Sequence, residues 1–432
     1  MATLGPFTNI LVPAEKHDAT NGTLYFAKDT SPLFDTAIFS RPNVDATSGA
    51  TVFRNGQLIE LAENEPDWDD SSGCPVLKMR PQEEGLFLKT DDISAPQWDI
   101  GENTISSNSN LDPFGDLRAD KIIPNTNNVR HDAAQAITKA ASALDYSLVS
   151  YLKTDGIRQY VIIGLRGGSL TNRSFLTIDL FNGTIITNDT NGFTHIKSKV
   201  TLLSSGYCEI KLVCKTLTDT NLACWLIPSN GPGNILSGDA VYAGNATDGI
   251  IHGGTQVVQS SDYVDYIRNP STSTLTRSAN SFEFTDLVTK GVLGTNEGSI
   301  LFHFEEPLFK YNTDLLNVLF ISDGIDNTKY LRFRGNSSNT VFQVIGYGNI
   351  ISATLDNTQS AFIISWKDKK VEIFDQNGVA NSSIQTLDID IKAINKWGST
   401  TMVSIIPIGF KKIAASPISL TEAQAIAYLA SL

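Results

Sequence analysis

The chain has 432 residues, of which 41% are hydrophobic and 18% are charged, and its formal net charge is −13. A chain of this length is too long for one hydrophobic core, so we expect two or three domains. The acidic balance argues against nucleic acid as a partner, because phosphate binding needs a basic surface. No apolar run approaches the roughly 18 residues that cross a bilayer, and membrane insertion is not expected.

The first hundred residues show little regular apolar periodicity and are rich in Pro, Asp and Gly. One hairpin stands out at residues 50–61, where Asn55-Gly56 separates two short apolar runs. The N-terminus lacks a basic stretch followed by an apolar one, so no signal peptide is expected. We interpret residues 1–100 as a segment for attachment and oligomerisation that takes its order from its neighbours.

From about residue 115, apolar and polar residues alternate in short runs separated by Gly, Asn and Asp. This pattern predicts strands at 144–152, 158–165, 175–181, 196–203, 208–215 and 222–227. Many short strands at such spacing favour a β-sandwich or jelly roll over an α/β fold. The first of these domains is assigned to residues 101–270.

A stretch rich in Pro, Ser and Thr at 269–280 is interpreted as a linker, and a second domain is assigned to residues 271–432. Its predicted strands are 299–305, 316–322, 330–334, 341–345, 361–366, 371–374 and 402–408. A short helix follows, because Ser419 and Glu422 have capping-box spacing and one face carries Leu420, Ala423, Ile426, Ala427 and Ala430. The predicted fold class is therefore all-β, with an irregular N-terminal segment, two antiparallel sandwiches and a short C-terminal helix.

Of the four cysteines, Cys208, Cys214 and Cys224 are predicted to share one hairpin, and Cys74 lies far from them in the sequence. A disulfide between Cys214 and Cys224 across that hairpin is possible in geometry, whereas free buried thiols are the interpretation we favour for a chain made in the cytosol. No CxxC pair is present, so zinc is not expected.

Adjacent polar residues give no convincing catalytic site. His131 and Asp132 point to opposite faces of a strand, and the predicted environment is an exposed polar strand. Glu83-Glu84 and Glu305-Glu306 are adjacent carboxylates, whereas glycoside hydrolysis uses two carboxyl groups that converge from different positions. We therefore expect the chain not to be an enzyme. A polysaccharide-degrading spike is further disfavoured because the short repeated rungs of a β-helix are absent from the sequence.

Several motifs in order resemble one family. They are Phe39-Ser-Arg41, the 50–60 stretch ATVFRNGQLIE, Ala62-Glu-Asn-Glu-Pro66, Cys74-Pro-Val-Leu-Lys-Met-Arg-Pro-Gln82, Gln97-Trp98, the 249–256 stretch GIIHGGTQ and the 263–270 stretch YVDYIRNP. Together with the 363–378 hairpin and the closing helix, they are similar to the virion proteins of tailed bacteriophages. His252 stands where the family has Trp, and residues 80–85 lack the family's Arg-Thr-Asn.

The resemblance implies a carbohydrate-binding-module-like sandwich followed by a concanavalin A-like or laminin G-like sandwich, both lectin-like. It implies a structural protein of the virion surface, a fibre or fibre-like decoration that is made in the bacterial host cytoplasm and attaches to host-surface glycan. Other virion proteins would contact the N-terminal segment, and a homo-oligomer, with a trimer favoured, would form. The alternative is a purely structural protein that bridges capsid or tail proteins without binding glycan.

Exposed aromatic side chains are what a sugar-binding surface needs, since pyranose rings stack on them. Trp225 is expected to point away from the face that Cys224 and Leu226 share. Phe175 and Phe181 are expected to share a face with Asp179, and these four residues are the candidate ligand-binding set. An inter-domain or inter-subunit contact is the alternative for each ring. No cofactor is required by the sequence, and the only calcium candidates are Asp323 and Asp326 on a polar loop.

Overall fold

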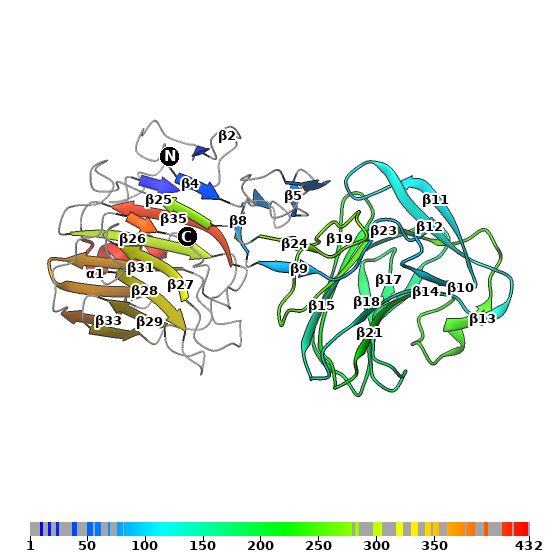
Figure 1. Cartoon of the computed structure of the whole chain (residues 1–432). Coiled ribbons are helices and arrows are strands. Elements are labelled where there is room, and N and C mark those ends of the chain that lie inside the picture. The colour runs from blue at the N-terminus through cyan, green and yellow to red at the C-terminus, as the bar shows by residue number, and fades with distance from the viewer. Residues whose placement is uncertain are drawn as a thin grey trace. The chain divides into compact units, whose positions relative to one another are not determined.

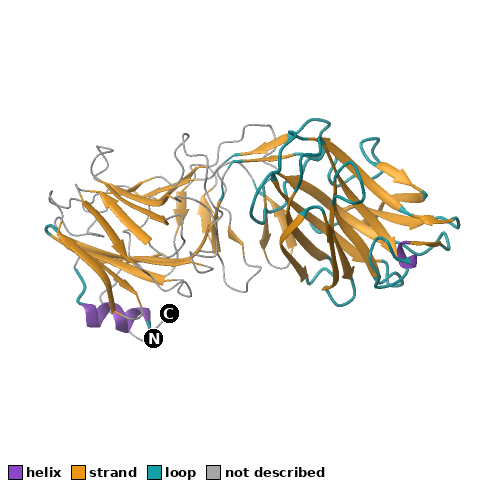
Figure 2. Ribbon diagram, turned by 90° about the horizontal axis from the view of Figure 1, so that it is seen from below, coloured by secondary structure: helices purple, strands orange, loops and turns teal. Residues whose placement is uncertain are grey.

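In a computed structural model of the chain, residues 82–278 are described continuously. Outside that range the described residues are short strands, a few residues beside them and the C-terminal helix. The protein is all-β, as predicted, and its antiparallel sheets form sandwich-like domains (Figure 2). Among the described residues, no helix is long and apolar enough to cross a membrane.

Contacts divide the chain into two compact units, each described here by itself (Figure 1). Unit 1 comprises Met1–Asn43, Ala62–Gln82 and Ser278–Leu432, and unit 2 comprises Val44–Leu61 and Glu83–Arg277. The first hundred residues are thus shared between the two units. The division into domains at residues 100 and 270 stays a prediction.

Unit 2 is a sandwich of two six-stranded antiparallel sheets. The sheet that we call the β21 sheet has the order β10 (Asp99–Gly101), β14 (Asp132–Thr138), β21 (Asn221–Ser229), β16 (Tyr160–Arg166), β17 (Arg173–Asp179), β18 (Thr184–Asn191). The β15 sheet has the order β11 (Asn103–Leu111), β12 (Leu117–Pro124), β23 (Ile250–Val258), β15 (Asp145–Thr154), β20 (Cys208–Lys215), β19 (Thr194–Leu202). The six strands predicted for this region are all present.

The core of unit 2 lies between these sheets and follows from the two-residue alternation of each strand. On β17, Leu176 and Ile178 point into it with Leu180 of the following turn, and all three are at most 1% exposed. Residues 83–100 add three more side chains to the same core, namely Phe87, Ile93 and Trp98. A chain that began after residue 100 would lack this part of the core.

The three described cysteines are free and buried, as favoured from the sequence, but they do not share a hairpin. Cys208 and Cys214 lie on β20, whereas Cys224 lies on β21 in the opposite sheet, and all three contribute to the core. The predicted hairpin was wrong because β20 and β21, although consecutive in the chain, belong to different sheets. Burial raises the pKa of the Cys208 and Cys214 thiols to about 12, which keeps them protonated and unreactive.

Two glycines permit close approaches that a side chain would block. Gly164 on β16 lies opposite Phe175, and a Cβ there would lie 2.1 Å from the Ser174 carbonyl oxygen. Gly254 has a φ of +142° and would place a Cβ 2.4 Å from the Tyr266 hydroxyl. It lies beside a register shift in the β15–β23 ladder, so β23 bends where Tyr266 packs against it.

Smaller strand pairs complete unit 2. The predicted hairpin is present as β5 (Thr51–Arg54) and β6 (Gln57–Glu60), whose register pairs Arg54 with Gln57. β13 (Asn128–Arg130) pairs with β22 (Val241–Ala243), which follows a short 3-10 turn, Gly238–Ala240. β9 (Glu83–Gly85) pairs with β24 (Leu275–Arg277).

The described strands of unit 1 form two antiparallel sheets. One has the order β33 (Gly378–Ile384), β32 (Lys370–Asp375), β31 (Ala361–Lys367), β26 (Glu297–Phe304), β35 (Ile408–Ser416), β8 (Val76–Met79), β7 (Trp68–Asp69), with β1 (Asn9–Leu11) also on β35. The other has the order β2 (Lys16–Asp18), β3 (Thr23–Tyr25), β4 (Ala37–Ser40), β25 (Ser281–Phe284), β34 (Ala393–Asn395), β27 (Asn317–Ser322), β28 (Tyr330–Gly335), β29 (Phe342–Gly346), β30 (Asn349–Ala353).

N-terminal strands of unit 1 pair with strands from the C-terminal half of the same chain. β4 pairs with β25, and both β1 and β8 pair with β35. These strands therefore gain their order from the C-terminal half of this chain. The predicted strand at 402–408 lies, except for its last residue, outside the described residues.

The C-terminal helix α1 (Glu422–Leu429) packs on a sheet of unit 1 through Ala425 and Leu429, which share a hydrophobic cluster with Leu420 and Phe374. The predicted apolar face was wrong in part, since Ala423 and Ala427 are exposed. Its capping box differs from the predicted one. The Thr421 amide donates to the Gln424 side chain at 3.0 Å, and the Gln424 amide donates to Thr421 Oγ1 at 3.4 Å. Ser419 instead lies 2.9 Å from Ser365, because it faces the sheet.

Candidate functional site

Trp225 lies on the face of the β21 sheet that points away from the core, as the alternation with Cys224 and Leu226 predicted. It pairs with Ala134 on β14 and with Gly164 on β16, and neither neighbour carries a bulky side chain. Only 8% of its surface is exposed, however. The ring is covered by other side chains and offers little area to a sugar.

Two guanidinium groups lie against this ring. The Cζ atoms of Arg130 and Arg166 each lie 4.2 Å from the centroid of the Trp225 ring. A guanidinium stacked on the indole is attracted by the ring's negative face. Sequence reasoning missed both arginines, because they end two different strands, β13 and β16, whose meeting local patterns do not reveal.

Phe175 was expected to be exposed, and this prediction is wrong. The residue is on the predicted face of β17 but only 1% exposed, because it packs in one cluster with Trp225 under the 230–240 segment. Ile235 and Ala240 supply that cover, and Thr177 Oγ1 donates to the Gly233 carbonyl at 2.9 Å. Period-two alternation identifies a face, but it does not reveal a loop that folds over the face.

Phe181 is exposed (45%) and lies in the turn after β17, away from the Phe175–Trp225 cluster. Asp179 shapes that turn and is buried. Its carboxylate accepts from the amides of Phe181 and Asn182 and from the side chains of Asn182 and Gln159. Burial raises the pKa of Asp179, but these hydrogen bonds outweigh it and hold the pKa below its usual value. The carboxylate is engaged in the turn rather than open to a ligand.

The polar pairs considered for catalysis are structural or separated. His131 is fully buried rather than exposed, with Nδ1 2.7 Å from the Glu102 carbonyl oxygen and Nε2 2.9 Å from that of Tyr242. It lies between β13 and β14 and contacts Tyr242 of β22, a neighbour that the sequence pattern did not reveal. Glu83 forms an ion pair with Arg277, whereas Glu84 is exposed.

Glu305-Glu306 and the calcium candidates Asp323 and Asp326 lie outside the described residues. Within the part of the chain that is described, no group of three or more His, Cys, Asp or Glu side chains is arranged to hold a metal ion.

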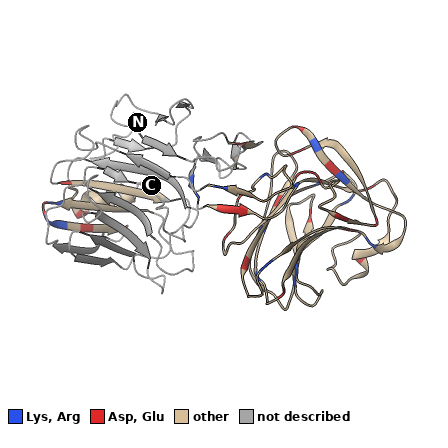
Figure 3. Ribbon diagram, viewed as in Figure 1, with Lys and Arg blue, Asp and Glu red and all other residues tan. Residues whose placement is uncertain are grey.

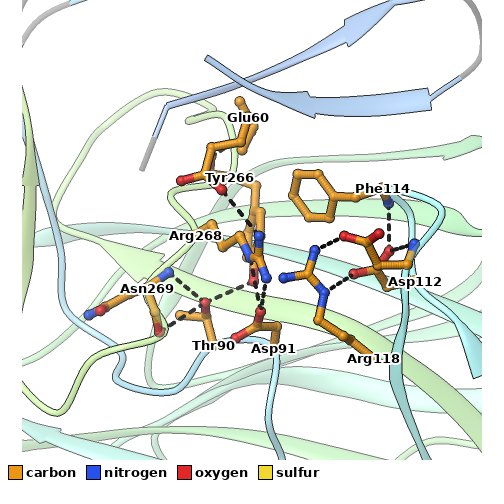
Figure 4. Close-up of polar contacts among 11 residues, drawn as sticks. Glu60, Thr90, Asp91, Asp112, Phe114, Arg118, Tyr266, Arg268 and Asn269 are labelled. Atoms are coloured by element: carbon orange, nitrogen blue, oxygen red, sulfur yellow. Dashed lines mark hydrogen bonds and ion pairs between the residues drawn. The ribbon is translucent and has the colours of Figure 1, made fainter. Parts of the chain in front are cut away.

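A polar cluster centred on Arg268 lies on unit 2 where the β5–β6 hairpin meets the sandwich (Figure 4). Arg268 donates to Asp91 at 2.9 Å and to Glu60 at 3.1 Å, and its guanidinium carbon lies 5.1 Å from the ring centroid of Phe114. Burial lowers the pKa of Arg268, but the two carboxylates raise it above its usual value. This arginine is fully compensated, and it fastens the hairpin.

Neutral hydrogen bonds extend the same cluster (Figure 4). The Tyr266 hydroxyl donates to Thr90 Oγ1 at 2.8 Å, and the Asn269 amide donates to the same oxygen at 2.8 Å. All three residues are completely buried. The cluster therefore holds three distant parts of the chain together, and its polar groups bind one another.

Charges of both signs are scattered over unit 2 (Figure 3). The short strand β9 carries adjacent acidic residues, Glu83 and Glu84, while β12 carries Arg118 and Lys121. Arg130 and Arg166 are thus a local cationic pair on a chain whose net charge is −13.

No protein-family model matches the chain, and no curated protein matches it in sequence. Among solved structures it is similar to a Trypanosoma rangeli sialidase in complex with the inhibitor DANA, with 8% identity and a TM-score of 0.25 over 72% of this chain and 60% of the sialidase. It is similar to the LG1–3 region of the laminin α2 chain, with 10% identity and a TM-score of 0.23 over 68% of this chain and 66% of that one.

A third similar structure is the CBM22-1–CBM22-2 tandem domain of Xyn10C from Paenibacillus barcinonensis, with 9% identity and a TM-score of 0.25 over 79% of this chain and 99% of that one. The similar structures thus include laminin G and CBM22 sandwiches. Likenesses this distant transfer no residue role or activity to this chain.

The expectation that the chain is not an enzyme is corrected by these comparisons, because the similar structures include a sialidase. Residues that are adjacent in the sequence do not reveal a catalytic site whose groups converge from different loops. At TM-scores of 0.25 and 0.26 the likeness assigns no reaction to this chain.

Proposed function

We propose that this chain is a structural protein of a tailed-bacteriophage particle and that its sandwiches attach to glycan on the host surface. Its family motifs, given above, support the virion role. The observation that carries the glycan role is the outward face of the β21 sheet, where Trp225 underlies two arginines. Guanidinium groups held on a rigid sheet suit recognition of the oxygen atoms of a polar ligand such as a sugar.

Such a site would bind one glycan weakly, because it offers two guanidinium groups and little exposed aromatic area. Adhesion would then need several copies held together, and we propose a homo-oligomer, with a trimer favoured, on the virion surface. Its attachment to other virion proteins is assigned to the N-terminal segment, whose strands also complete the sheets of unit 1.

The test is a glycan array probed with the purified full-length chain, first alone and then displayed in several copies on a bead. Binding to a defined set of glycans that increases with the number of copies is the expected result. Absence of binding in both formats would remove the glycan role. Antibody labelling of intact particles tests the virion role separately, since it does not depend on glycan binding.

A second candidate is a protein that bridges other virion components without binding glycan. It is favoured by apolar side chains on the edge strands of unit 2, where Ile186 of β18 and Ile196 and Leu202 of β19 are all more than 40% exposed. Edge strands with apolar side chains are prone to pair with another chain. Ile186→Lys and Ile196→Lys should prevent pairing of these edges with another chain. Glycan binding that persists in these variants would show that the two functions use different surfaces.

A further inference from the structure

Arg130 and Arg166 reach the same aromatic ring from different strands. Arg130 ends β13 and Arg166 ends β16, and each guanidinium carbon lies 4.2 Å from the Trp225 ring centroid. The Arg130 side chain is 29% exposed and Arg166 is partly exposed, whereas Trp225 is buried. The indole of Trp225 supports the two guanidinium groups, and a ligand would contact these groups rather than the ring.

The charge of this pair is poorly compensated. Arg130 approaches the Asp132 carboxylate at 3.4 Å, which is a long contact for an ion pair. Within residues 82–278, Arg166 has no side-chain hydrogen bond or ion pair, and its buried Nε has no hydrogen-bond partner. Burial and the neighbouring charge of Arg130 lower the pKa of Arg166, while only Asp132 raises it. Because a guanidinium stays protonated in proteins, this charge cannot be given up.

Two other buried arginines of unit 2 are each paired with carboxylates. Arg173 is paired with Asp189 at 2.8 Å, and Arg268 is paired with two carboxylates. A half-buried donor without an acceptor reduces stability. An arginine kept in that state beside a second one is therefore suited to a ligand that brings the missing acceptor.

We propose that Arg130 and Arg166 bind an acidic sugar residue, whose carboxylate supplies the missing counter-charge. A planar guanidinium matches a carboxylate in a two-point hydrogen bond, and it also donates to sugar hydroxyls. Stacking on Trp225 holds both groups in place, so little side-chain entropy is lost when the sugar binds. This inference rests on the proposed glycan role and names its ligand class, a glycan that contains uronic or sialic acid.

Binding of the full-length chain to sialyllactose and to an oligogalacturonate, by calorimetry at about 0.15 M salt, tests this. At that ionic strength the screening length is about 8 Å, so the distant carboxylates of the chain are screened while direct contacts persist. Lactose is the neutral counterpart of sialyllactose, and sodium acetate and sodium sulfate are the free-anion competitors. Tighter binding of at least one acidic saccharide than of lactose is expected, with little competition from 10 mM of either salt.

Arg166→Gln and Arg130→Gln should each weaken binding of the acidic saccharide about ten-fold or more, since charge-assisted hydrogen bonds are among the strong ones. Lys199→Gln is the matched control, because it removes the same charge from an exposed position on β19. It should leave binding unchanged. Thermal melting confirms that each variant is folded.

Failure of this inference can be told apart from failure of the proposed glycan role. Binding of lactose or another neutral glycan without preference for the acidic one would overturn the acidic-sugar site and leave the glycan role standing. Equal binding by a folded Arg166→Gln variant, or full displacement by acetate or sulfate, would also overturn it. No binding of any saccharide would remove both proposals together.

Discussion

Two partly buried arginines of unit 2 have opposite electrostatic surroundings. Arg268 is held between Asp91 and Glu60, and the carboxylates raise its pKa. Arg166 has Trp225 beneath it and Arg130 beside it, and its pKa is lowered. The first arrangement stabilises the fold, because each charge has an opposite charge within reach. The arrangement around Arg166 lowers the stability of the fold. A charged group without an opposite charge beside it is typical of a binding surface.

A third buried basic side chain, His252, is neutral at pH 7. It is completely buried on β23, its ring centroid lies 5.6 Å from that of Trp98, and Nε2 lies 3.0 Å from Thr255 Oγ1. Burial lowers its pKa from 6.5 to about 4, although the charges of Asp91 and Asp92 act in the opposite direction. Histidine can adopt the neutral form at pH 7, which an arginine cannot.

The largest expected effect is a loss of stability in acid caused by His252. Its pKa is lower in the folded than in the unfolded chain, so only the unfolded state takes up the proton between pH 6.5 and about 4. The free energy of unfolding of unit 2 should fall by about 3 kcal/mol across this window. Hydrogen exchange of β15 and β23 amides at several pH values measures it. His252→Asn should be less stable at pH 7 but lose less on acidification; an equal loss in both would contradict the assignment.

Removal of the compensated charge should have the next largest effect. Arg268→Met leaves Asp91 and Glu60 without their cation, and we expect unit 2 to lose about 2 kcal/mol. The value lies below that for fully buried pairs because the Glu60 side chain is 30% exposed. Urea dependence of hydrogen exchange in the β5–β6 hairpin and in β15 gives the measurement, with Lys199→Gln as the control for charge. Stability equal to that of the control would show that the cluster does not fasten the hairpin.

Removal of the uncompensated charge should change stability much less. Arg166→Gln loses the contact with Trp225 but relieves repulsion by Arg130, so we expect a change below about 1 kcal/mol in either direction. The same exchange experiment measures it. A loss as large as that of Arg268→Met would mean that Arg166 serves the fold, and the contrast between the two arginines would disappear.

The sequence predicted the local features of unit 2 better than the long-range ones. Alternation on β17 and β21 assigned the core face correctly, and Asn55-Gly56 located the β5–β6 hairpin. These features depend on residues close together in the chain. The 230–240 segment over Phe175 and the meeting of Arg130 with Arg166 depend on strand order and register, which local patterns do not contain. Similarly, β23 was missed because Gly253 and Gly254 interrupt its apolar pattern.

The smallest expected effect on stability belongs to Phe181, and it makes this ring the most informative of the three predicted aromatics. Phe175→Ala would remove a ring that is 1% exposed and destabilise unit 2 by about 3 kcal/mol, so any loss of binding could reflect misfolding. Phe181 is 45% exposed, and Phe181→Ala should change stability by less than about 0.5 kcal/mol. If its ring stacks on a sugar, glycan binding should weaken about five-fold, as the loss of one stacking contact predicts. Unchanged binding by this variant, together with a loss in Arg166→Gln, would place the ligand over Trp225 and away from the turn that Asp179 holds.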